Sequence, residues 1–376
     1  MKESGLYIHV PFCEHKCIYC DFYSIITTGK VRDYIDALKR EITYYQPLYS
    51  ESRFFSSIFF GGGTPSILAP DLIAEIIGAL YQSYTISGDA EITMETNPGT
   101  VDESKLRAFK LAGINRVSVG IQSFNDADLK FLTRVHDSQT AINTIHTLRE
   151  CGFENINLDL IFNLPGQTLE AWTKNLEEAV KLPVQHISAY SLILERGTIL
   201  YKMQVEKKVV ISDDDFDAEL YRETISFLSD NGFEQYEVSN FAKPGYQCRH
   251  NNHYWQYRDY LSFGTSAHSF MNGKRWWNNS ALTFYLRSMK NTGHARSGEE
   301  IITPDEMHDE YIMLALRNSG IDTNDYISKF GSGWLIAKQP EFDKLLSAGF
   351  MKNTEGRLQM TASGYAVCDE IIKRLL

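Results

Sequence analysis

Three of the six cysteines in this sequence lie close together near its start. They are Cys13, Cys17 and Cys20, spaced C-x3-C-x2-C in the segment CEHKCIYC (13–20). A compact loop with this spacing can point three sulfurs at one centre, and three thiolates on a 4Fe–4S cluster leave one iron without a protein ligand. An open coordination position marks a reactive metal site, because a substrate or cofactor must occupy it. The pattern therefore predicts a 4Fe–4S cluster with one exchangeable iron.

Two other uses of these cysteines stay open from the residues alone. A structural zinc site would take His9 or His15 as its fourth ligand, although structural zinc usually binds two separated pairs of ligands. A disulfide plus one free thiol is disfavoured in a reducing compartment. The other cysteines, Cys151, Cys248 and Cys368, stand singly, which is typical of a reducing cytoplasm.

A glycine-rich segment follows a short apolar run. GGGTPS (61–66) comes directly after SIFF (57–60). Glycines allow positive φ angles and close backbone approach, and the bare N–H groups can receive a carboxylate. A tight turn after a strand is the simpler alternative.

Further polar residues lie at or just beyond the ends of later apolar runs. They are Glu95 in METNPGT (94–100), Gln122 in GIQSF (120–124), Arg134, and Asp159 in NLDLIFNLPGQT (157–168). Any one of them alone would be interpreted as a satisfied cap. Several on successive strand ends predict one shared ligand.

These residues lie close together only if the fold places the carboxyl ends of the strands at one edge of a sheet. Six short β-rich runs each precede a segment with apolar residues at helical spacing. The runs are LYIHV (6–10), SIFF (57–60), AEITM (90–94), RVSVGI (116–121), INLDLIF (156–162) and HISAYSLI (186–193). Asp102, Gly113 and Gly152 match helix start and stop signals. Because parallel strands need long crossovers, we predict an α/β fold with an open, partial (β/α)6 barrel over residues 1–232. Ligands of such sheets bind at the carboxyl ends of the strands.

The pattern changes after residue 232. FEQYEVSNFA (233–242) alternates like one antiparallel strand, and KRWWNN (274–279) is expected to seal the open barrel by packing. We assign 233–303 to an antiparallel, aromatic-rich extension of the barrel. Residues 304–376 read as helices beside the ribbon FMKNTEGRLQMT (350–361), which predicts a small winged-helix-like α+β domain. Acidic residues outnumber basic ones there, which argues against DNA binding.

The composition and the N-terminal segment indicate which partners are not expected and where in the cell we expect the protein. The 376 residues are 43% hydrophobic and 23% charged, with a net charge of −11 and no run of Lys or Arg. Nucleic acid and anionic membranes are therefore not expected as partners. The segment MKESGLYIHVPF (1–12) lacks the apolar region of a signal peptide, so we expect a cytoplasmic protein.

The cysteine spacing after a first barrel strand resembles the radical S-adenosylmethionine (SAM) superfamily. The later segments are similar, in order and spacing, to oxygen-independent coproporphyrinogen III oxidase and its relatives from Gly5 to about Gly273. The resemblance implies a radical SAM barrel in which SAM chelates the open iron. It also implies that SAM contacts the residues Tyr7, Tyr19, Gly62, Gly63, Thr64, Glu95, Gln122, Arg134 and Asp159.

Two features depart from the oxidase itself. The oxidase has a fourth cysteine where this chain has Phe22, and a long arm where this chain has four residues before Gly5. CRHNNHYW (248–255) instead contains H-N-x-x-Y-W, which resembles the signature of the HemW branch of haem chaperones. Imidazole is a common axial ligand of haem iron, so His250 is the expected haem-binding residue. Cys248, His253 and His268 compete for that role.

The resemblance thus implies a haem chaperone that binds haem and delivers it to haem-dependent membrane proteins. It would retain the 4Fe–4S cluster and SAM binding, and we expect no coproporphyrinogen oxidase activity. The alternative is that oxidase activity, a radical SAM decarboxylation in porphyrin biosynthesis; another radical SAM enzyme is a third interpretation. A homodimer would be consistent with the family, and receiving proteins would bring the chain to the membrane surface.

Overall fold

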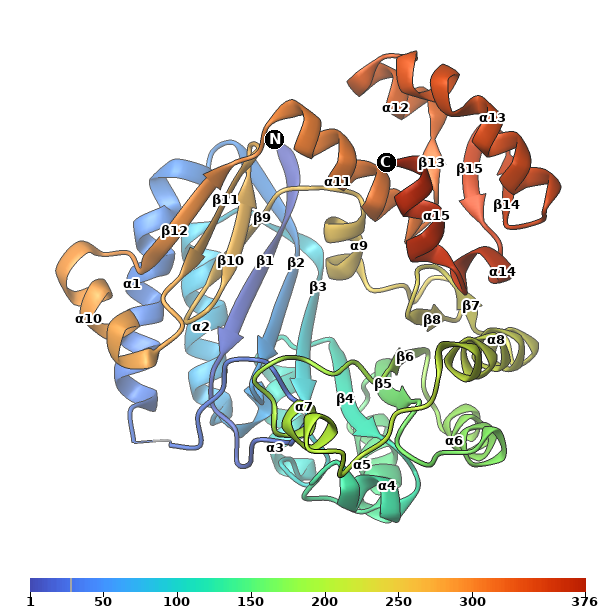
Figure 1. Cartoon of the computed structure of the whole chain (residues 1–376). Coiled ribbons are helices and arrows are strands. Elements are labelled where there is room, and N and C mark those ends of the chain that lie inside the picture. The colour runs from blue at the N-terminus through green and yellow to red at the C-terminus, as the bar shows by residue number, and fades with distance from the viewer. Residues whose placement is uncertain (28) are drawn as a thin grey trace.

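The computed structural model describes residues 1–27 and 29–376, within which twelve strands form one curved sheet (Figure 1). The six strands expected from the sequence are all present. They are β1 (Lys2–Val10), β2 (Arg53–Gly62), β3 (Ile86–Thr96), β4 (Arg116–Gln122), β5 (Asn155–Phe162) and β6 (His186–Ser191). They are hydrogen-bonded in chain order and every pair is parallel. The α/β fold with a partial (β/α)6 barrel is therefore confirmed.

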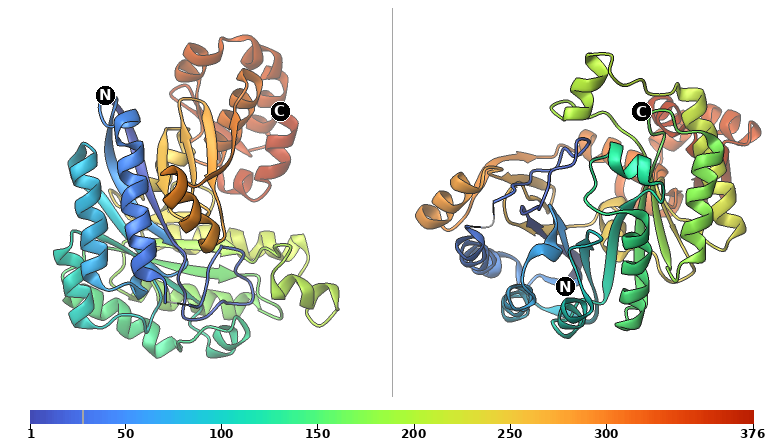
Figure 2. Two further views of the ribbon diagram at one scale, coloured as in Figure 1. Left: turned by 90° about the vertical axis from the view of Figure 1, so that its left-hand side faces the viewer. Right: turned by 90° about the horizontal axis from the view of Figure 1, so that it is seen from below.

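Helices of the crossovers cover the outer face of this sheet (Figure 2). The helical segments up to residue 230 are α1 (Val31–Tyr49), the short 3-10 turn η1 (Pro65–Ile67), α2 (Pro70–Ser83), α3 (Glu103–Leu111), α4 (Asp126–Phe131), α5 (Ser138–Glu150), α6 (Leu169–Lys181), α7 (Ile199–Val205) and α8 (Asp214–Asp230). The side chain of Asp102 caps α3 by accepting from Lys105 N at 2.8 Å. Gly113 and Gly152 follow α3 and α5 with positive φ angles, so these three signals predicted the helix ends correctly.

The two faces of the barrel strands differ in chemistry. In β4 the outward residues Val117, Val119 and Ile121 are fully buried against the helices. The alternate residues, starting with Arg116 and Ser118, point to the concave side, because successive side chains of a strand face opposite ways. The outer face thus supplies the hydrophobic core, and the inner face is polar.

Residues 233–303 extend the sheet at both edges. The segment 233–242 does not form the single strand expected, because residues 236–239 turn the chain between two short antiparallel strands, β7 (Glu234–Gln235) and β8 (Asn240–Ala242). The chain then forms α9 (Arg249–Trp255), β9 (Tyr260–Phe263), β10 (His268–Met271), β11 (Lys274–Asn278), α10 (Leu282–Thr292) and β12 (Arg296–Ile301). Strand β9 pairs with β1, and β10–β12 continue the sheet beyond it.

The aromatic segment 274–279 packs at one edge of the sheet and does not seal the barrel as expected. Trp276 on β11 is buried and stacks on Tyr45 and Tyr49 of α1, with ring centroids 5.7 and 6.2 Å away. It therefore fixes the added strands to helix α1 at one edge of the sheet.

The C-terminal residues build a second, smaller core. They form α11 (Pro304–Leu316), β13 (Ile321–Asp322), α12 (Thr323–Phe330), α13 (Gly333–Ser347), β14 (Met351–Thr354), β15 (Arg357–Met360), α14 (Ala362–Tyr365) and α15 (Cys368–Leu375). Strands β14 and β15 pair as the expected ribbon, and β13 joins them in a separate sheet. This is the winged-helix-like α+β unit, although the boundaries at 232 and 303 stay predictions. Judged by length and apolar content, none of the helices in residues 1–27 and 29–376 qualifies as a membrane span.

Candidate cofactor and ligand cavity

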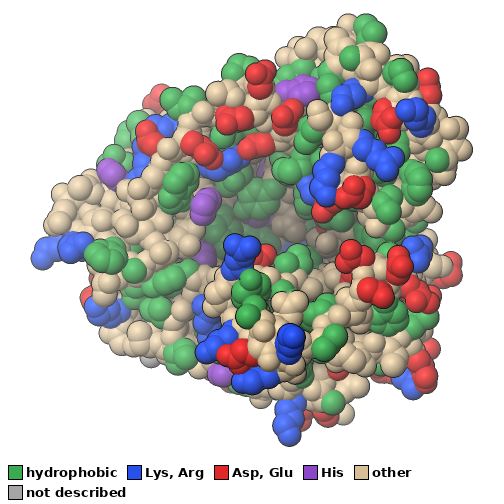
Figure 3. Space-filling model, in the orientation of Figure 1, with side chains coloured by type: hydrophobic (Ala, Val, Ile, Leu, Met, Phe, Trp, Pro, Cys, Tyr) green, Lys and Arg blue, Asp and Glu red, His purple; other side chains and the backbone are tan. Residues whose placement is uncertain are grey.

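A cavity of about 670 Å³ lies on the concave side of the sheet. Its walls come from β1–β6, the loop after β1, residues 191–195 and α9; in Figure 3 this face is hollowed at its centre, with hydrophobic side chains visible inside. Every site residue expected from the sequence lines it. These are Tyr7, Cys13, Cys17, Tyr19, Cys20, Gly62, Gly63, Thr64, Glu95, Gln122, Arg134, Asp159 and His250.

Backbone hydrogen bonds pin both ends of the cysteine loop. Cys13 N donates to Ile25 O at 2.9 Å, and Ile25 N donates to Pro11 O at 2.7 Å. The glycine segment packs beneath, because Thr64 N donates to Phe12 O at 2.7 Å and a Cβ on Gly63 would lie 2.6 Å from that same oxygen. Loop and glycine segment therefore form one wall of the cavity.

The three thiols are held by different neighbours. Cys13 is 9% exposed, and its Sγ lies 3.4 Å from Thr64 Oγ1. Arg134 donates to Cys17 Sγ at 3.6 Å, and burial raises the pKa of the Cys20 thiol to about 11. Among the described residues, no three His, Cys, Asp or Glu side chains are gathered as a metal-ligand set. All three sulfurs nevertheless face one cavity, and a cationic guanidinium beside Cys17 suits an anionic thiolate cluster.

Gly62 and Glu95 meet at the ends of β2 and β3. Gly62 N donates to Glu95 Oε2 at 3.2 Å. Gly62 has a φ of 106°, and a Cβ there would lie 2.7 Å from the His9 ring, so a larger residue would not fit. Burial, and then the nearby Asp159 carboxylate, raise the pKa of Glu95 to about 8.

The end of β4 is strained where it meets the cavity. Gln122 has a φ of 75°, a left-handed conformation that is uncommon for residues other than glycine. Arg134 reaches back to the same strand, donating to Gly120 O at 2.5 Å and to Asn97 Oδ1 at 2.6 Å. A longer bond of 3.5 Å runs from Arg134 to the Tyr19 hydroxyl.

Asp159 on β5 belongs to a hydrogen-bonded group on neighbouring strands. Asn157 Nδ2 donates to its Oδ1 at 2.7 Å, and Ser118 donates to its Oδ2 at 3.2 Å. Burial raises its pKa despite these donors. Two carboxyl groups with raised pKa values, Asp159 and Glu95, thus face the cavity, where they suit hydroxyl or ammonium groups of a ligand.

His250 is buried with both ring nitrogens hydrogen-bonded. It is 1% exposed, its Nδ1 lies 2.9 Å from Ser57 Oγ, and its Nε2 lies 2.8 Å from the Tyr254 hydroxyl. Burial lowers its pKa well below 6.5, so the ring is neutral. The ring stacks on Phe59 with centroids 5.1 Å apart.

The three competitors of His250 lie outside the cavity lining. Cys248 and His253 are buried, and His253 Nε2 lies 3.1 Å from Ser56 Oγ. His268 is exposed on β10, where its ring stacks on Trp277. Only His250 of these four lines the cavity in the described part of the chain.

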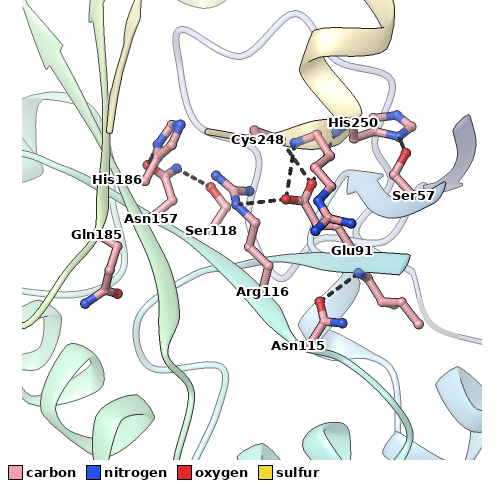
Figure 4. A network of polar contacts seen from close by, with 12 residues as sticks. Ser57, Glu91, Asn115, Arg116, Ser118, Asn157, Gln185, His186, Cys248 and His250 are labelled. Carbon is pink, nitrogen blue, oxygen red and sulfur yellow. Dashed lines mark hydrogen bonds and ion pairs between the residues drawn. The ribbon is translucent and has the colours of Figure 1, made fainter. Parts of the chain in front are cut away.

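Sequence reasoning missed several inward-facing residues. Arg116, Asn97 and Tyr190 line the cavity, as do the exposed apolar side chains of Phe22 and Ile193 at its mouth. A signal was present for Arg116, because it alternates with apolar residues in RVSVGI and shares the face of Ser118. Figure 4 shows Arg116 between Ser118 and Glu91.

Comparisons with known proteins place this geometry in a family. Residues 7–179 match the model of the radical SAM superfamily. The heme chaperone HemW of Lactococcus lactis is 31% identical over 100% of this chain and 98% of its own. That of Bacillus subtilis is 33% identical over 98% of both chains. The chain belongs to the HemW family. Membership of the superfamily implies a 4Fe–4S cluster and SAM.

The HemW-family fold is also found in a solved structure. Coproporphyrinogen III oxidase (HemN) from Escherichia coli, a radical SAM enzyme, matches with a TM-score of 0.84 over 99% of this chain and 90% of its own. At 24% identity this likeness supports the fold alone.

Proposed function

We propose that this protein is a haem chaperone, which binds haem and passes it to haem-dependent membrane proteins. The observation that carries the proposal is the match, over nearly the whole chain, to proteins named heme chaperone HemW. The cavity supports it, since a large pocket with aromatic walls and an exposed apolar mouth suits a flat, mostly apolar ligand.

We propose that the cysteine loop holds a 4Fe–4S cluster through Cys13, Cys17 and Cys20. SAM would bind the open iron and the strand-end residues, with the glycine amides of Gly62 and Gly63 near its methionine end. When bound, such a cluster supplies one electron to the sulfonium. The chain's own part is to orient SAM, with Arg134 fixing Asn97 and Gly120 beside it.

His250 is the proposed haem ligand, and the structure defines what ligation would require. One ring nitrogen must exchange its bond to Ser57 or Tyr254 for iron. The Nε2 side is the better candidate, because Tyr254 lines the cavity while Ser57 does not. The ring is already neutral, as an iron ligand must be.

Haem titration of the anaerobically reconstituted protein tests the function. We expect one haem per chain and a Soret band typical of an axial nitrogen ligand. A haem-free membrane cytochrome should also take up haem faster from this protein than it takes up free haem from solution. His250→Ala should diminish the Soret shift, and His268→Ala, on the far strand β10, should leave it unchanged.

The oxidase alternative is tested with the same preparation. Coproporphyrinogen, SAM and a reductant are added without oxygen, and we expect no decarboxylated product over many turnovers. Accumulating product would refute the chaperone and restore the oxidase. Failure to bind haem at stoichiometric concentration would refute the chaperone on its own. Light scattering with and without the cluster tests whether the protein forms the homodimer that would be consistent with the family.

A further inference from the structure

Arg116 is a buried cation whose side chain has no hydrogen-bond partner among the described residues. It begins β4, is 2% exposed, and lines the cavity. No hydrogen bond from its guanidinium is found within residues 1–27 and 29–376, and its Nε is buried and unpaired. The ion pair that it forms with Glu91 Oε2 spans 4.0 Å, which is too long for a hydrogen bond.

Two other arginines, Arg53 and the half-buried Arg134, also have an unpaired Nε within the described residues, but both donate from their Nη atoms. Arg53, equally buried, donates from Nη2 to Asn272 at 2.6 Å and also to Asp259. Arg134 donates to Asn97, Gly120, Cys17 and Tyr19. A buried charge without such partners is costly, so Arg116 stands out as a group whose partner comes from outside the chain.

Glu91 does not fill that role, because its carboxylate serves helix α9. Its Oε2 accepts from Arg249 N at 3.2 Å, and its Oε1 accepts from His250 N at 3.2 Å and from Cys248 Sγ at 3.5 Å. Glu91 thereby holds the start of the helix that carries His250 (Figure 4). The guanidinium keeps its N–H groups for another acceptor.

The surroundings favour a singly charged acceptor. Arg116 lines the same cavity as Asp159, and Glu91 lies next to Arg116. A dianionic phosphate would add two negative charges beside these carboxyl groups. A carboxylate adds one and matches the planar guanidinium with two parallel hydrogen bonds.

We propose that Arg116 is a carboxylate subsite and that it binds a propionate of the haem cargo. This inference rests on the proposed function and deepens it. The subsite lies inside the barrel, behind the strand-end residues proposed for SAM, because Arg116 begins β4 whereas Gln122 ends it. A propionate bound there would orient the macrocycle relative to His250, which lines the same cavity.

The test compares haem with its dimethyl ester, in which both propionate groups are esterified and carry no charge. Both ligands are titrated by Soret absorbance into wild type, Arg116→Met and Arg116→Lys. Arg53→Lys is the matched control, because Arg53 is as buried but lies outside the cavity lining. Circular dichroism verifies that each variant is folded, and SAM affinity is measured alongside.

Wild type and Arg53→Lys should bind haem about 10- to 100-fold more tightly than the ester, as expected for a charge-assisted pair. Arg116→Met should lose that preference, and Arg116→Lys should keep part of it. An unchanged preference in folded Arg116→Met would overturn the subsite. If Arg116→Met weakened SAM binding and left the haem affinity unchanged, the carboxylate bound by Arg116 would be that of SAM. That result would also overturn the propionate subsite. Failure of wild type to bind either macrocycle would instead refute the proposed function itself.

Discussion

Glu95 should make the stability of this protein fall between pH 6 and pH 9. Burial raises its pKa from 4.5 to about 8, so between these two pH values the folded chain holds a proton that the unfolded chain has released. The contribution is fully present below pH 4.5 and is lost as the pH rises through about 8. Glu95→Gln keeps an acceptor for Gly62 N but cannot ionise, so it removes this dependence.

The size of the effect follows from the shift in pKa. Each pH unit between the two pKa values changes the free energy of unfolding by about 1.4 kcal/mol, which gives a loss of about 2–3 kcal/mol from pH 6 to pH 9. Part of the Glu95 carboxyl faces the cavity, where water lessens the desolvation, so the lower end is the better estimate. Glu41 and Glu237, with pKa values near 7, make stability depend on pH in the same direction. Both are present in wild type and in Glu95→Gln, so their contributions cancel when these two proteins are compared.

Urea unfolding of cluster-free protein at pH 6, 7.5 and 9 measures this difference. Glu75→Gln is the control, because hydrogen bonds from Arg32 and Lys39 lower the pKa of Glu75 to about 2 and it stays ionised throughout. The free energy of unfolding of Glu75→Gln should change with pH as steeply as that of wild type. Equal slopes for wild type and Glu95→Gln would refute the argument that burial keeps this carboxyl protonated.

Three further outcomes are expected. Replacing any one cysteine of the loop with Ala should abolish the four irons per chain gained on anaerobic reconstitution, measured by iron assay, whereas Cys151→Ala should retain them. Gly62→Ala should lower the free energy of unfolding by at least about 1–3 kcal/mol and weaken SAM binding, because its positive φ and the His9 ring leave no room for a Cβ. Gly78→Ala, inside α2 with open space around it, should instead raise the stability by about 0.5–1 kcal/mol, as followed by urea unfolding.

The parallel barrel could be predicted because its signals are local. Runs such as RVSVGI, and the cap at Asp102, report strand and helix within a few residues. The prediction of a single strand over 233–242 failed because the alternation of apolar and polar residues continues through a turn. Tyr236 and its neighbours form that turn without glycine or proline. The packing partner of Trp276 lies more than 200 residues away, so sequence alone could not place it.

The site was predictable wherever a motif marks a strand's carboxyl end. Glu95, at the end of β3, was found this way. Asp159 also lines the cavity, but it lies in the middle of β5 and not at the end that was expected. Arg116 was missed because it stands at the opposite end of its strand. Hydrogen bonding could not be predicted either. Whether Arg116 is paired depends on Glu91 capping a helix that begins more than 150 residues later.

The cavity is continuous from the cysteine loop to Arg116, and this has a thermodynamic consequence. Any two ligands that occupy it together share walls and space, so their affinities are coupled. Linkage requires the coupling to be reciprocal: if one ligand changes the dissociation constant of the other by some factor, the second changes that of the first by the same factor. Titrating either ligand in the presence of the other therefore measures one free energy from two directions, and the order in which they enter leaves it unchanged.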